Sequence, residues 1–416
     1  MWLDWLGRDG KIILVEKAVR TVPYGFLGVL YAVYLKQLGF DLFLIGVVLT
    51  VTTASSALYT LVASFVADSL GRKRTLIFFA LMDALAGALL ISSREWWAPV
   101  AAGVVGNMTV GAGEVGPYLS LEQAILPQTS DAKHRTLAFS LYNLIGYLSS
   151  AVGAILVGLP QLVGFAPSDY RVLFLIYLLS GLAGSILYST VSNRAEHVPS
   201  RGQTRLLSEK SKPLVVKLSA LFAVDAFGGG FIGQSILSLY FLLRYNLEPT
   251  SLGLISAAAS IVTAVSFLAA ARIARRIGLL KTMVFTHIPS NLFLLAIPFA
   301  PIASYAVLLL LCRQSLSQMD VPARQSFVMS MVPEEDRTPA AGLTNVSRTI
   351  AQSFSPSLAG YAIESLWLGS PFIFAGGLKL TYDLSLYRAF HKVKVSEDEL
   401  DPGQDESSRA QTPISS

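Results

Sequence analysis

The chain has 416 residues, of which 53% are hydrophobic and only 14% are charged. Soluble domains carry about a quarter charged residues, so this composition excludes an ordinary water-soluble protein of this size. The net charge is +5, but the bases lie in short loops without the interleaved aromatic residues of a nucleic-acid-binding face. The single cysteine, Cys312, and four scattered histidines argue against disulfides or a metal site. We expect a membrane protein with no metal, cofactor or nucleic-acid partner.

The chain begins with a charged segment and continues with twelve long apolar segments. Residues 1–25 lack the short apolar core and cleavage site of a signal peptide, so we expect the N-terminus to be retained. A membrane-spanning helix needs about 20 predominantly apolar residues. Segments of that kind run over approximately 19–38, 43–66, 74–93, 97–120, 136–159, 171–192, 216–243, 251–273, 281–299, 302–322, 339–363 and 369–389.

The longest connection follows the sixth segment and is polar and basic. The apolar segments are too long for barrel strands, so we expect helices, which satisfy their own backbone groups inside a bilayer. The predicted fold class is all-α and integral to the membrane, with two six-helix bundles at 1–192 and 216–391. We expect residues 193–215 to form a cytoplasmic loop and the polar, acidic residues 392–416 to form a disordered cytoplasmic tail.

Lysines and arginines are distributed unequally between the connections. If the N-terminus is cytoplasmic, 25 of the 32 fall on the cytoplasmic side and four fall on the other side, namely Lys36, Arg94, Arg171 and Arg244. Membrane proteins concentrate Lys and Arg in their cytoplasmic loops. The distribution therefore predicts that both termini lie in the cytoplasm, and we expect a multi-pass protein of the plasma membrane.

The two halves of the chain repeat one pattern. The sequence R-T-x-A-x-x-L-x-N occurs at 135–143 and again at 337–345, each time at the start of the fifth apolar segment of its half. Gly46 and Gly71 correspond, at one constant offset, to Gly253 and Gly278. Duplicated units of this kind are typical of secondary transporters, whose substrate sites lie between the repeats near the midplane.

The motif after the second apolar segment indicates a family. Residues 64–73 read SFVADSLGRK and resemble the G-x-L-A-D-R-x-G-R-R/K motif of the major facilitator superfamily. The matching residues are Asp68, Gly71, Arg72 and Lys73, whereas serines replace the first glycine and the first arginine. With twelve spans and the repeat, the resemblance covers nearly the whole chain. Residues 318–338 are also similar to the corresponding connection of an uncharacterised prokaryotic-type branch, for which no substrate can be assigned.

The resemblance implies a latch between the halves. In the family the motif acid lies near the N-terminus of the eleventh helix, which we expect to begin here with Thr338 as N-cap and Pro339 in the first turn. A carboxylate near that positive helix end contributes about 0.3–1 kcal/mol. Asp68 is therefore predicted to favour the outward-open state, weakly because Ser69 replaces an arginine. The alternative is a basic loop with an incidental acid.

Charged residues inside the predicted spans are costly in a bilayer and are therefore candidates for function. The resemblance implies that helices 1, 4, 7 and 10 line a cavity and that helices 2, 5, 8 and 11 flank it. The candidates for contact with a solute or a proton are Arg20, Glu114, Asp225, Arg313, Arg348 and Gln352. For each charge the alternative is a structural ion pair, such as Asp225 with Arg348 or Glu16 with Arg20.

Three charges on the expected peripheral helices are predicted to be structural. Asp83 lies in the third span, and Lys379 and Asp383 lie in the last. Because Lys379 and Asp383 are four residues apart, they can pair within one helix.

The sequence carries no phosphate-binding loop of an ATP-driven pump and no paired-histidine zinc motif. The fifth span also lacks the proline of the G-x-x-x-G-P-x-x-G-G stretch found in drug antiporters of the family. We therefore predict a monomeric secondary transporter, not an enzyme, that moves a small solute across the lipid bilayer by alternating access, either coupled to protons or by facilitated diffusion. Mixed acids and arginines suit an anionic or zwitterionic solute. The alternatives are a multidrug exporter and a sensor or scaffold that does not transport.

Overall fold

The computed structural model describes residues 5–109, 116–129, 134–166, 168–192 and 207–392, without the side chains of a few helical positions, Asp68 among them. The first half contains α1 (Arg8–Gln37), α2 (Leu42–Leu70), α3 (Arg72–Ser92), α4 (Trp97–Val105), α5 (Pro117–Ile125), α6 (Arg135–Ile155), α7 (Leu159–Leu162) and α8 (Arg171–Ser189). The second half contains α9 (Lys212–Gly230), α10 (Gln234–Tyr245), α11 (Pro249–Ile277), α12 (Leu279–Ala296), α13 (Ala303–Ser317), α14 (Asp320–Ser330), α15 (Arg337–Ser365) and α16 (Ser370–Phe390).

Eight helical segments of the described chain are long and apolar enough to cross a membrane. They comprise α1, α2, α3, α6, α8, the pair α9–α10, α11 and α12. The other four predicted spans correspond to the interrupted pairs α4–α5 and α13–α14 and to the more polar helices α15 and α16. The helices of the structure thus fit the twelve predicted spans, and the all-α membrane fold is confirmed.

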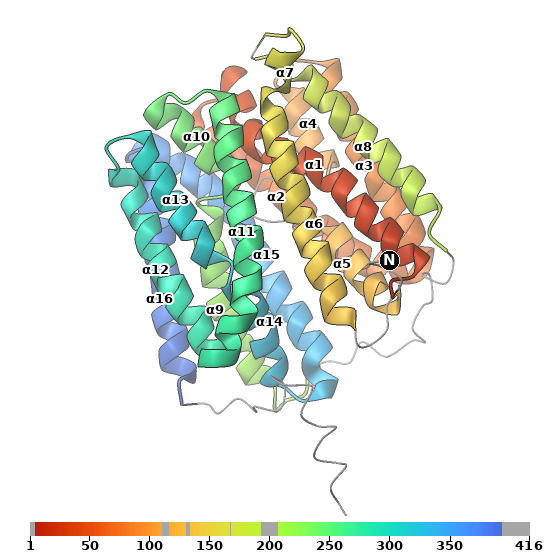
Figure 1. Ribbon diagram of the computed structural model, residues 1–416, viewed down its shortest axis with the longest axis vertical. Helices are drawn as coiled ribbons and strands as arrows, with labels where there is room; N and C mark the ends of the chain where they lie inside the picture. Colours follow the sequence, from red (N-terminus) through yellow and green to blue (C-terminus); the bar gives the residue numbers. More distant parts are fainter. Residues whose placement is uncertain (1–4, 110–115, 130–133, 167, 193–206, 393–416) are drawn as a thin grey trace, which may run out of the picture.

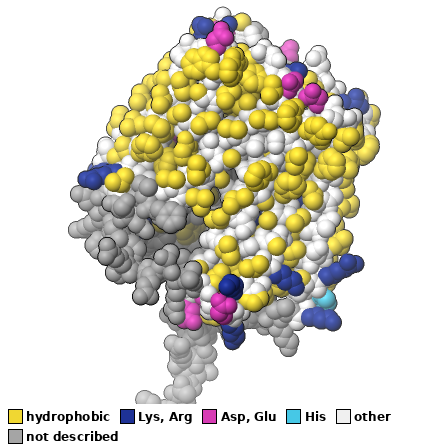
Figure 2. Space-filling model, turned by 180° about the vertical axis from the view of Figure 1, so that it is seen from behind, with side chains coloured by type: hydrophobic (Ala, Val, Ile, Leu, Met, Phe, Trp, Pro, Cys, Tyr) yellow, Lys and Arg dark blue, Asp and Glu magenta, His cyan; other side chains and the backbone are white. Residues whose placement is uncertain are grey.

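The surface has the polarity of a protein embedded in lipid. Apolar side chains cover the middle of the molecule in Figure 2, and the charged side chains gather toward its two ends. Large apolar residues are exposed in the central parts of long helices, including Leu58, Leu179 and Val265, each more than half exposed. In water this surface would be strongly unfavourable, whereas acyl chains solvate it.

The fourth predicted span is interrupted in a stretch that is rich in glycine. In the fourth predicted span, α4 ends at Val105 and α5 begins only at Pro117, after Gly116 with φ 146°. Only glycine adopts this backbone conformation readily. The candidate Glu114 falls between the two helices and lies outside the described residues. In the seventh span, α9 begins at Lys212, four residues before its predicted start.

The eleventh predicted span begins differently from our expectation. Helix α15 starts at Arg337, so Asp336 is its N-cap residue and the prediction of a Thr338 cap is wrong. The Asp336 carboxylate does not cap its own helix, because it accepts hydrogen bonds from the backbone N–H (3.2 Å) and hydroxyl of Ser208. Pro339, at the third helical position, needs no hydrogen-bond partner for its nitrogen.

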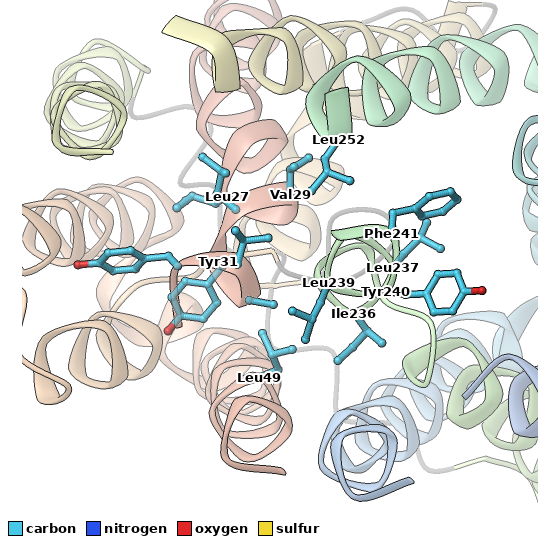
Figure 3. Close-up of a cluster of buried hydrophobic side chains, with 14 of the residues drawn as sticks. Leu27, Val29, Tyr31, Leu49, Ile236, Leu237, Leu239, Tyr240, Phe241 and Leu252 are labelled. Carbon is cyan, nitrogen blue, oxygen red and sulfur yellow. The ribbon is translucent and has the colours of Figure 1, made fainter. Parts of the chain in front are cut away.

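The buried apolar side chains of the described residues form three clusters, and one of them contains residues of both halves. This shared cluster joins α1 and α2 to α10 and α11. Val29 lies beside Leu252, and Leu49 lies near Ile236 and Leu239 (Figure 3). The second cluster belongs to the first half and the third to the second half. Both lie toward the end at which α1 begins and α16 terminates (Figure 1). The halves therefore pack together at the opposite end, where α1 ends and α10 lies. We call this the closed end.

Two glycines related by the repeat lie at the two seams of the closed end. A Cβ atom on Gly46 of α2 would lie 2.4 Å from the carbonyl oxygen of Pro356 in α15. A Cβ atom on Gly253 of α11 would lie 2.3 Å from the carbonyl oxygen of Ala154 in α6. Since both distances are far below van der Waals contact, these helix pairs approach closely only because the two positions are glycine.

Substitution of Gly253 by leucine is expected to separate α6 from α11. Overpacking of this kind typically costs about 1–3 kcal/mol, and it acts only on the conformation in which the seam is closed. The measurement is cross-linking of Gln161→Cys with Thr250→Cys, whose native side chains meet at 3.4 Å across this seam, in a Cys312→Ser background. The yield should fall for Gly253→Leu and stay unchanged for Gly377→Leu, where a Cβ meets nothing within 4 Å. Equal cross-linking yields in Gly253→Leu and Gly377→Leu would contradict a close contact of α6 with α11 at Gly253.

Candidate functional site

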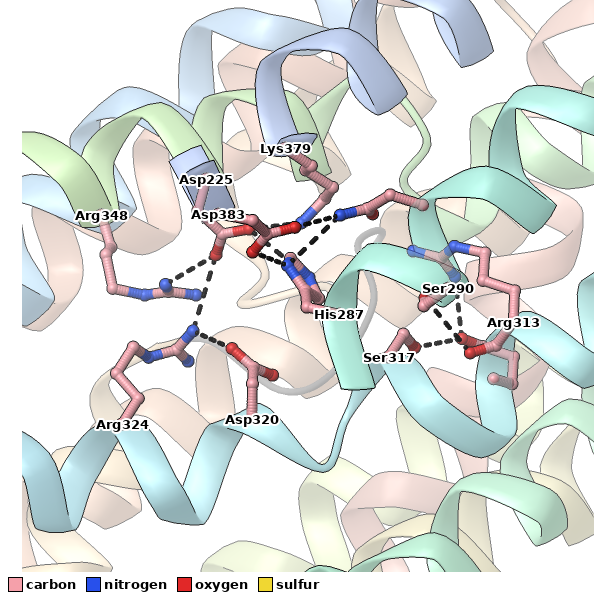
Figure 4. Close-up of polar contacts among 12 residues, drawn as sticks. Asp225, His287, Ser290, Arg313, Ser317, Asp320, Arg324, Arg348, Lys379 and Asp383 are labelled. Atoms are coloured by element: carbon pink, nitrogen blue, oxygen red, sulfur yellow. Dashed lines mark hydrogen bonds and ion pairs between the residues drawn. The ribbon is translucent and has the colours of Figure 1, made fainter. Parts of the chain in front are cut away.

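Asp225 of α9 is the centre of a buried ionic cluster in the second half (Figure 4). Its Oδ1 lies 2.6 Å from Nζ of Lys379 on α16. Its Oδ2 lies 3.0 Å from a terminal nitrogen of Arg348 on α15 and 3.5 Å from one of Arg324 on α14. A buried carboxylate needs such partners, because several kcal/mol are lost when an ion leaves water uncompensated. The Asp225–Arg348 pair considered from the sequence is therefore present, within a larger network.

The same cluster extends to α12 through a histidine. Nδ1 of His287 lies 2.8 Å from Oδ1 of Asp383, and Asn291 donates to Oδ2 of Asp383 at 2.8 Å. The predicted pairing of Lys379 with Asp383 is therefore wrong. Both residues do lie on one face of α16, as their spacing requires. Because that face packs against α9 and α12, Lys379 binds Asp225 and Asp383 binds His287 instead.

The cations of the cluster differ in their access to solvent. The side chain of Arg348 is 22% exposed, compared with 9% for Lys379 and 10% for Arg324, which also binds Asp320 at 2.8 Å. Arg348 is therefore the most exposed cation of this network. Gln352, one turn further along α15, instead lines a small gap of about 10 Å³ beside Leu49 of α2.

Arg313 of α13 lies next to this network and has no acidic partner among the described residues. Its side chain is buried, with 7% exposure, and its only hydrogen bond goes from a terminal nitrogen to Oε1 of Gln314 at 2.8 Å. Its Nε has no hydrogen-bond partner. A buried guanidinium without a carboxylate is costly, so its position calls for an explanation beyond packing.

Replacement of Arg313 by methionine is expected to raise the melting temperature of the purified protein. The unsatisfied Nε alone costs about 1–3 kcal/mol, and methionine fills a similar volume without a charge. The measurement is thermal unfolding in detergent, with Arg348→Met as the matched change, which should lower the melting temperature because it leaves Asp225 with fewer cations. A fall of similar size in both variants would contradict this interpretation of Arg313.

The first half contains a second buried ionic cluster, centred on Arg20 of α1. Its Nε lies 3.1 Å from the Glu16 carboxylate, and a terminal nitrogen lies 2.6 Å from Oε2 of Glu122 on α5. Tyr142 and Tyr188 donate hydroxyl hydrogen bonds to the same Glu122 carboxylate, at 2.6 and 2.7 Å. The local Glu16–Arg20 pair considered from the sequence is thus present, and Glu122 ties α1 to α5, α6 and α8.

Asp83 of α3 is surrounded by neutral hydrogen-bond donors, and no cation forms an ion pair with it among the described residues. Its carboxylate accepts hydrogen bonds from the hydroxyls of Tyr118 at 2.8 Å and Tyr177 at 2.9 Å and from the backbone N–H of Asn107 at 2.9 Å. Asn107 follows the end of α4. Asp83 therefore satisfies a backbone group that the interrupted fourth span leaves without a helical partner.

The two clusters lie on corresponding helices of the repeat, with their charges exchanged. Glu122 lies 13 residues before Arg135, and Arg324 lies 13 residues before Arg337. Arg20 lies 26 residues before Gly46, and Asp225 lies 28 residues before Gly253. In the first half the cation, Arg20, is on the first span and the acid, Glu122, is on the fourth. In the second half the acid, Asp225, is on the first span and the cation, Arg324, is on the fourth.

Each of these arginines also binds an acid four residues earlier in its own helix. Arg20 binds Glu16, and Arg324 binds Asp320. The repeat has therefore kept an arginine between two carboxylates while exchanging the helices that carry them. The halves differ in the remaining partners of the acid: two tyrosines bind Glu122, whereas Lys379 and Arg348 bind Asp225.

Comparison with known sequences assigns the family. The model of the Major Facilitator Superfamily matches residues 18–356, most of the chain. The chain belongs to the Major Facilitator Superfamily. An uncharacterized membrane protein of Saccharomyces cerevisiae is 24% identical over 417 residues, covering 91% of this chain and 93% of the yeast protein. The resemblance inferred from residues 64–73 is therefore confirmed.

Solved structures show the superfamily fold as well. The nucleoside transporter NupG matches with a TM-score of 0.70 at 15% identity, covering 93% of this chain and all of NupG. The human organic anion transporter MFSD10 matches with 0.67 at 14%, covering 91% of this chain and 99% of that one. An auto-inhibited peptide transporter of the POT family matches with 0.73 at 11%, covering 93% and 97%. At these identities the likeness concerns the fold alone.

The superfamily motif lies at the end opposite the closed end. Gly71 separates α2 from α3 with φ 93°, a conformation that favours glycine. Arg72 donates to the carbonyl of Ala124 at 3.4 Å, and Lys73 donates to that of Val191 at 2.8 Å. Both cations therefore bind carbonyls near the ends of helices in their own half. The Asp68 side chain is outside the described residues, so its latch role stays a prediction.

Proposed function

We propose that this superfamily member is a secondary transporter that moves a small anionic or zwitterionic solute by alternating access. One observation carries the choice of solute: among the described residues of Figure 4, the Asp225 network and the adjacent Arg313 together carry one more cation than carboxylates. The cations are Arg313, Arg324, Arg348 and Lys379, and the carboxylates are Asp225, Asp320 and Asp383. A negatively charged solute would balance the remaining charge. The human neighbour described as an organic anion transporter supports the same class.

The packing of the halves supports alternating access. They share a buried apolar cluster at the closed end and have separate clusters at the other end. With both termini in the cytoplasm, as the distribution of Lys and Arg predicts, this conformation faces the cytoplasm. The bundles at 1–192 and 216–391 would then rock about a site near the midplane, joined by the cytoplasmic loop 193–215 and followed by the tail 392–416.

Coupling to protons belongs to the same proposal. Carboxyl groups that lie inside a membrane and exchange partners between conformations are suitable proton carriers, and the candidates are Asp225 and Glu114. The Arg20 cluster has Glu16 and Glu122 on a single arginine and is a further group of this kind. We propose a monomer in the plasma membrane, since each chain of the superfamily fold contains both repeats around its own site.

Loss of the latch is expected to favour the conformation described here. Asp68→Asn removes a contact that would form only when the opposite end closes, which at about 0.3–1 kcal/mol shifts the equilibrium roughly two- to fivefold. The measurement is the cross-linking yield of the Gln161→Cys and Thr250→Cys pair at the closed end, which should rise. An unchanged yield would indicate a basic loop without a latch.

A flux screen tests the proposed function. The protein is reconstituted in liposomes with a pH-sensitive dye inside, and organic anions, amino acids, sugars and cationic drugs are added outside under an imposed proton gradient. Proton movement with anions or zwitterions alone supports the proposal. Movement with cationic drugs alone would establish the multidrug alternative. Ligand-induced thermal stabilisation without flux of either protons or labelled solute would indicate a sensor.

A further inference from the structure

A surface groove lies between the beginning of α1 and the end of α8, and none of its lining residues belongs to either ionic cluster. It has a volume of about 400 Å³ and is lined by Arg8, Lys11, Ile12, Val15 and Leu187. The first two residues are cationic and lie in the first turn of α1, and the other three are apolar and lie along the groove. A strip of apolar surface that begins at a pair of cations is the arrangement that an acyl chain with an anionic headgroup requires.

The two cations have no role in the packing of the described chain. Arg8 and Lys11 are both exposed, and neither forms an ion pair there. The nearest acid in sequence, Asp9, is turned away, because its carboxylate accepts a hydrogen bond from the backbone N–H of Ser192 at 3.0 Å and another from the Ser192 hydroxyl. Cations in the first turn of a helix also oppose the helix dipole. An external anion would remove this unfavourable charge arrangement.

The apolar part of the groove likewise lacks a partner. Val15 is 52% exposed, and Ile186, the neighbour of Leu187 in α8, is 65% exposed. Both helices are among the segments that can cross a membrane, so this surface lies at the level where headgroups meet acyl chains. Lipids of the cytoplasmic leaflet are enriched in negative charge, and that leaflet is the one to which the predicted orientation assigns this end of the molecule.

We propose that the groove binds one anionic glycerophospholipid, with the phosphate between Arg8 and Lys11 and one acyl chain along Ile12, Val15 and Leu187. The site is separate from the proposed transport path, so a failure of either proposal leaves the other standing. The two cations and the apolar residues of the groove should both contribute to the affinity for the lipid. A free phosphate compound would depend on the cations alone.

The test is native mass spectrometry of the full chain released from nanodiscs that contain phosphatidylglycerol and phosphatidylcholine. Wild type should retain one phosphatidylglycerol, and Arg8→Gln/Lys11→Gln should retain about tenfold less. The matched control Arg275→Gln/Arg276→Gln removes two exposed cations of α11, away from the groove, and should retain the lipid. Val15→Trp, which fills the apolar part at an exposed position, should also lose it.

Three results would overturn the proposal. Equal loss in the Arg275→Gln/Arg276→Gln control would show a general effect of surface charge. Full retention in Val15→Trp, or displacement of the lipid by glycerol 3-phosphate at equal concentration, would show that only the headgroup is bound. Retention in Arg8→Gln/Lys11→Gln would show that these cations are not the site. Circular dichroism of each variant confirms that the helical fold is intact before the comparison.

Discussion

Replacement of Asp225 by asparagine is expected to destabilise the protein by about 3–5 kcal/mol, the usual cost of leaving buried charges without their partner. Asparagine keeps the shape of the side chain but removes the negative charge that Lys379 and Arg348 contact at 2.6 and 3.0 Å. The measurement is thermal unfolding in detergent. A melting temperature equal to that of wild type would show that the cluster is not held together by this carboxylate.

Two further variants make the result specific to charge. Asp225→Asn combined with Lys379→Gln removes one charge of each sign and should recover part of the lost stability. Glu248→Gln removes an exposed acid next to α11 that makes no capping hydrogen bond, and a surface change of this kind stays within about 0.5 kcal/mol. If the double variant is no more stable than Asp225→Asn, the loss arises from packing and not from charge balance.

Replacement of Arg20 by methionine is expected to have an effect of similar size, about 3–5 kcal/mol, in the first half. The change leaves Glu16 and Glu122 close together without the cation that binds both. Tyr142 and Tyr188 still donate to Glu122, but hydroxyl groups do not neutralise its charge. Thermal unfolding again provides the measurement, together with the fraction of protein recovered in the membrane.

A second substitution that restores the stability of Arg20→Met would show that the loss arises from unpaired negative charge. Glu122→Gln in the Arg20→Met background removes one of the two unpaired negative charges and should recover stability, whereas Glu122→Gln alone should lower it. Arg94→Met is the matched change at an exposed ion pair with Asp169, where the effect should stay within about 1 kcal/mol. Failure of the double variant to exceed Arg20→Met would contradict the arginine-centred arrangement.

The fold could be predicted from the sequence because lipid imposes simple rules. Length and polarity predicted the spans. The repeated glycines Gly46 and Gly253 indicated the duplication, and their role in close helix approach was seen only in the structure. The start of α15 was placed too late. The Thr338-Pro339 pair matches a cap, but Asp336 precedes it and is bound by Ser208, a residue remote in the chain.

The ionic partners could be predicted only in part. The helical spacing was enough to predict the ion pair of Glu16 with Arg20, since both residues lie on one helix. It failed for Lys379 and Asp383, because their common face meets other charged helices whose depth and rotation the sequence does not specify. His287 carried no motif at all, and its role depends on α12 packing against α16. The opposite polarity of the two halves could have been found by extending the repeat from Arg135 and Arg337 back to Glu122 and Arg324.

We propose that the cluster around Asp225 contacts the solute and does not only hold the helices together. The most direct measurement compares solute-driven flux and melting temperature in one preparation of Arg348→Gln, the variant of the most exposed cation in the network. We predict that flux is lost while the protein remains folded, with a melting temperature only a few degrees below that of wild type. Retained flux in a destabilised protein would show that Arg348 serves only to hold the helices together.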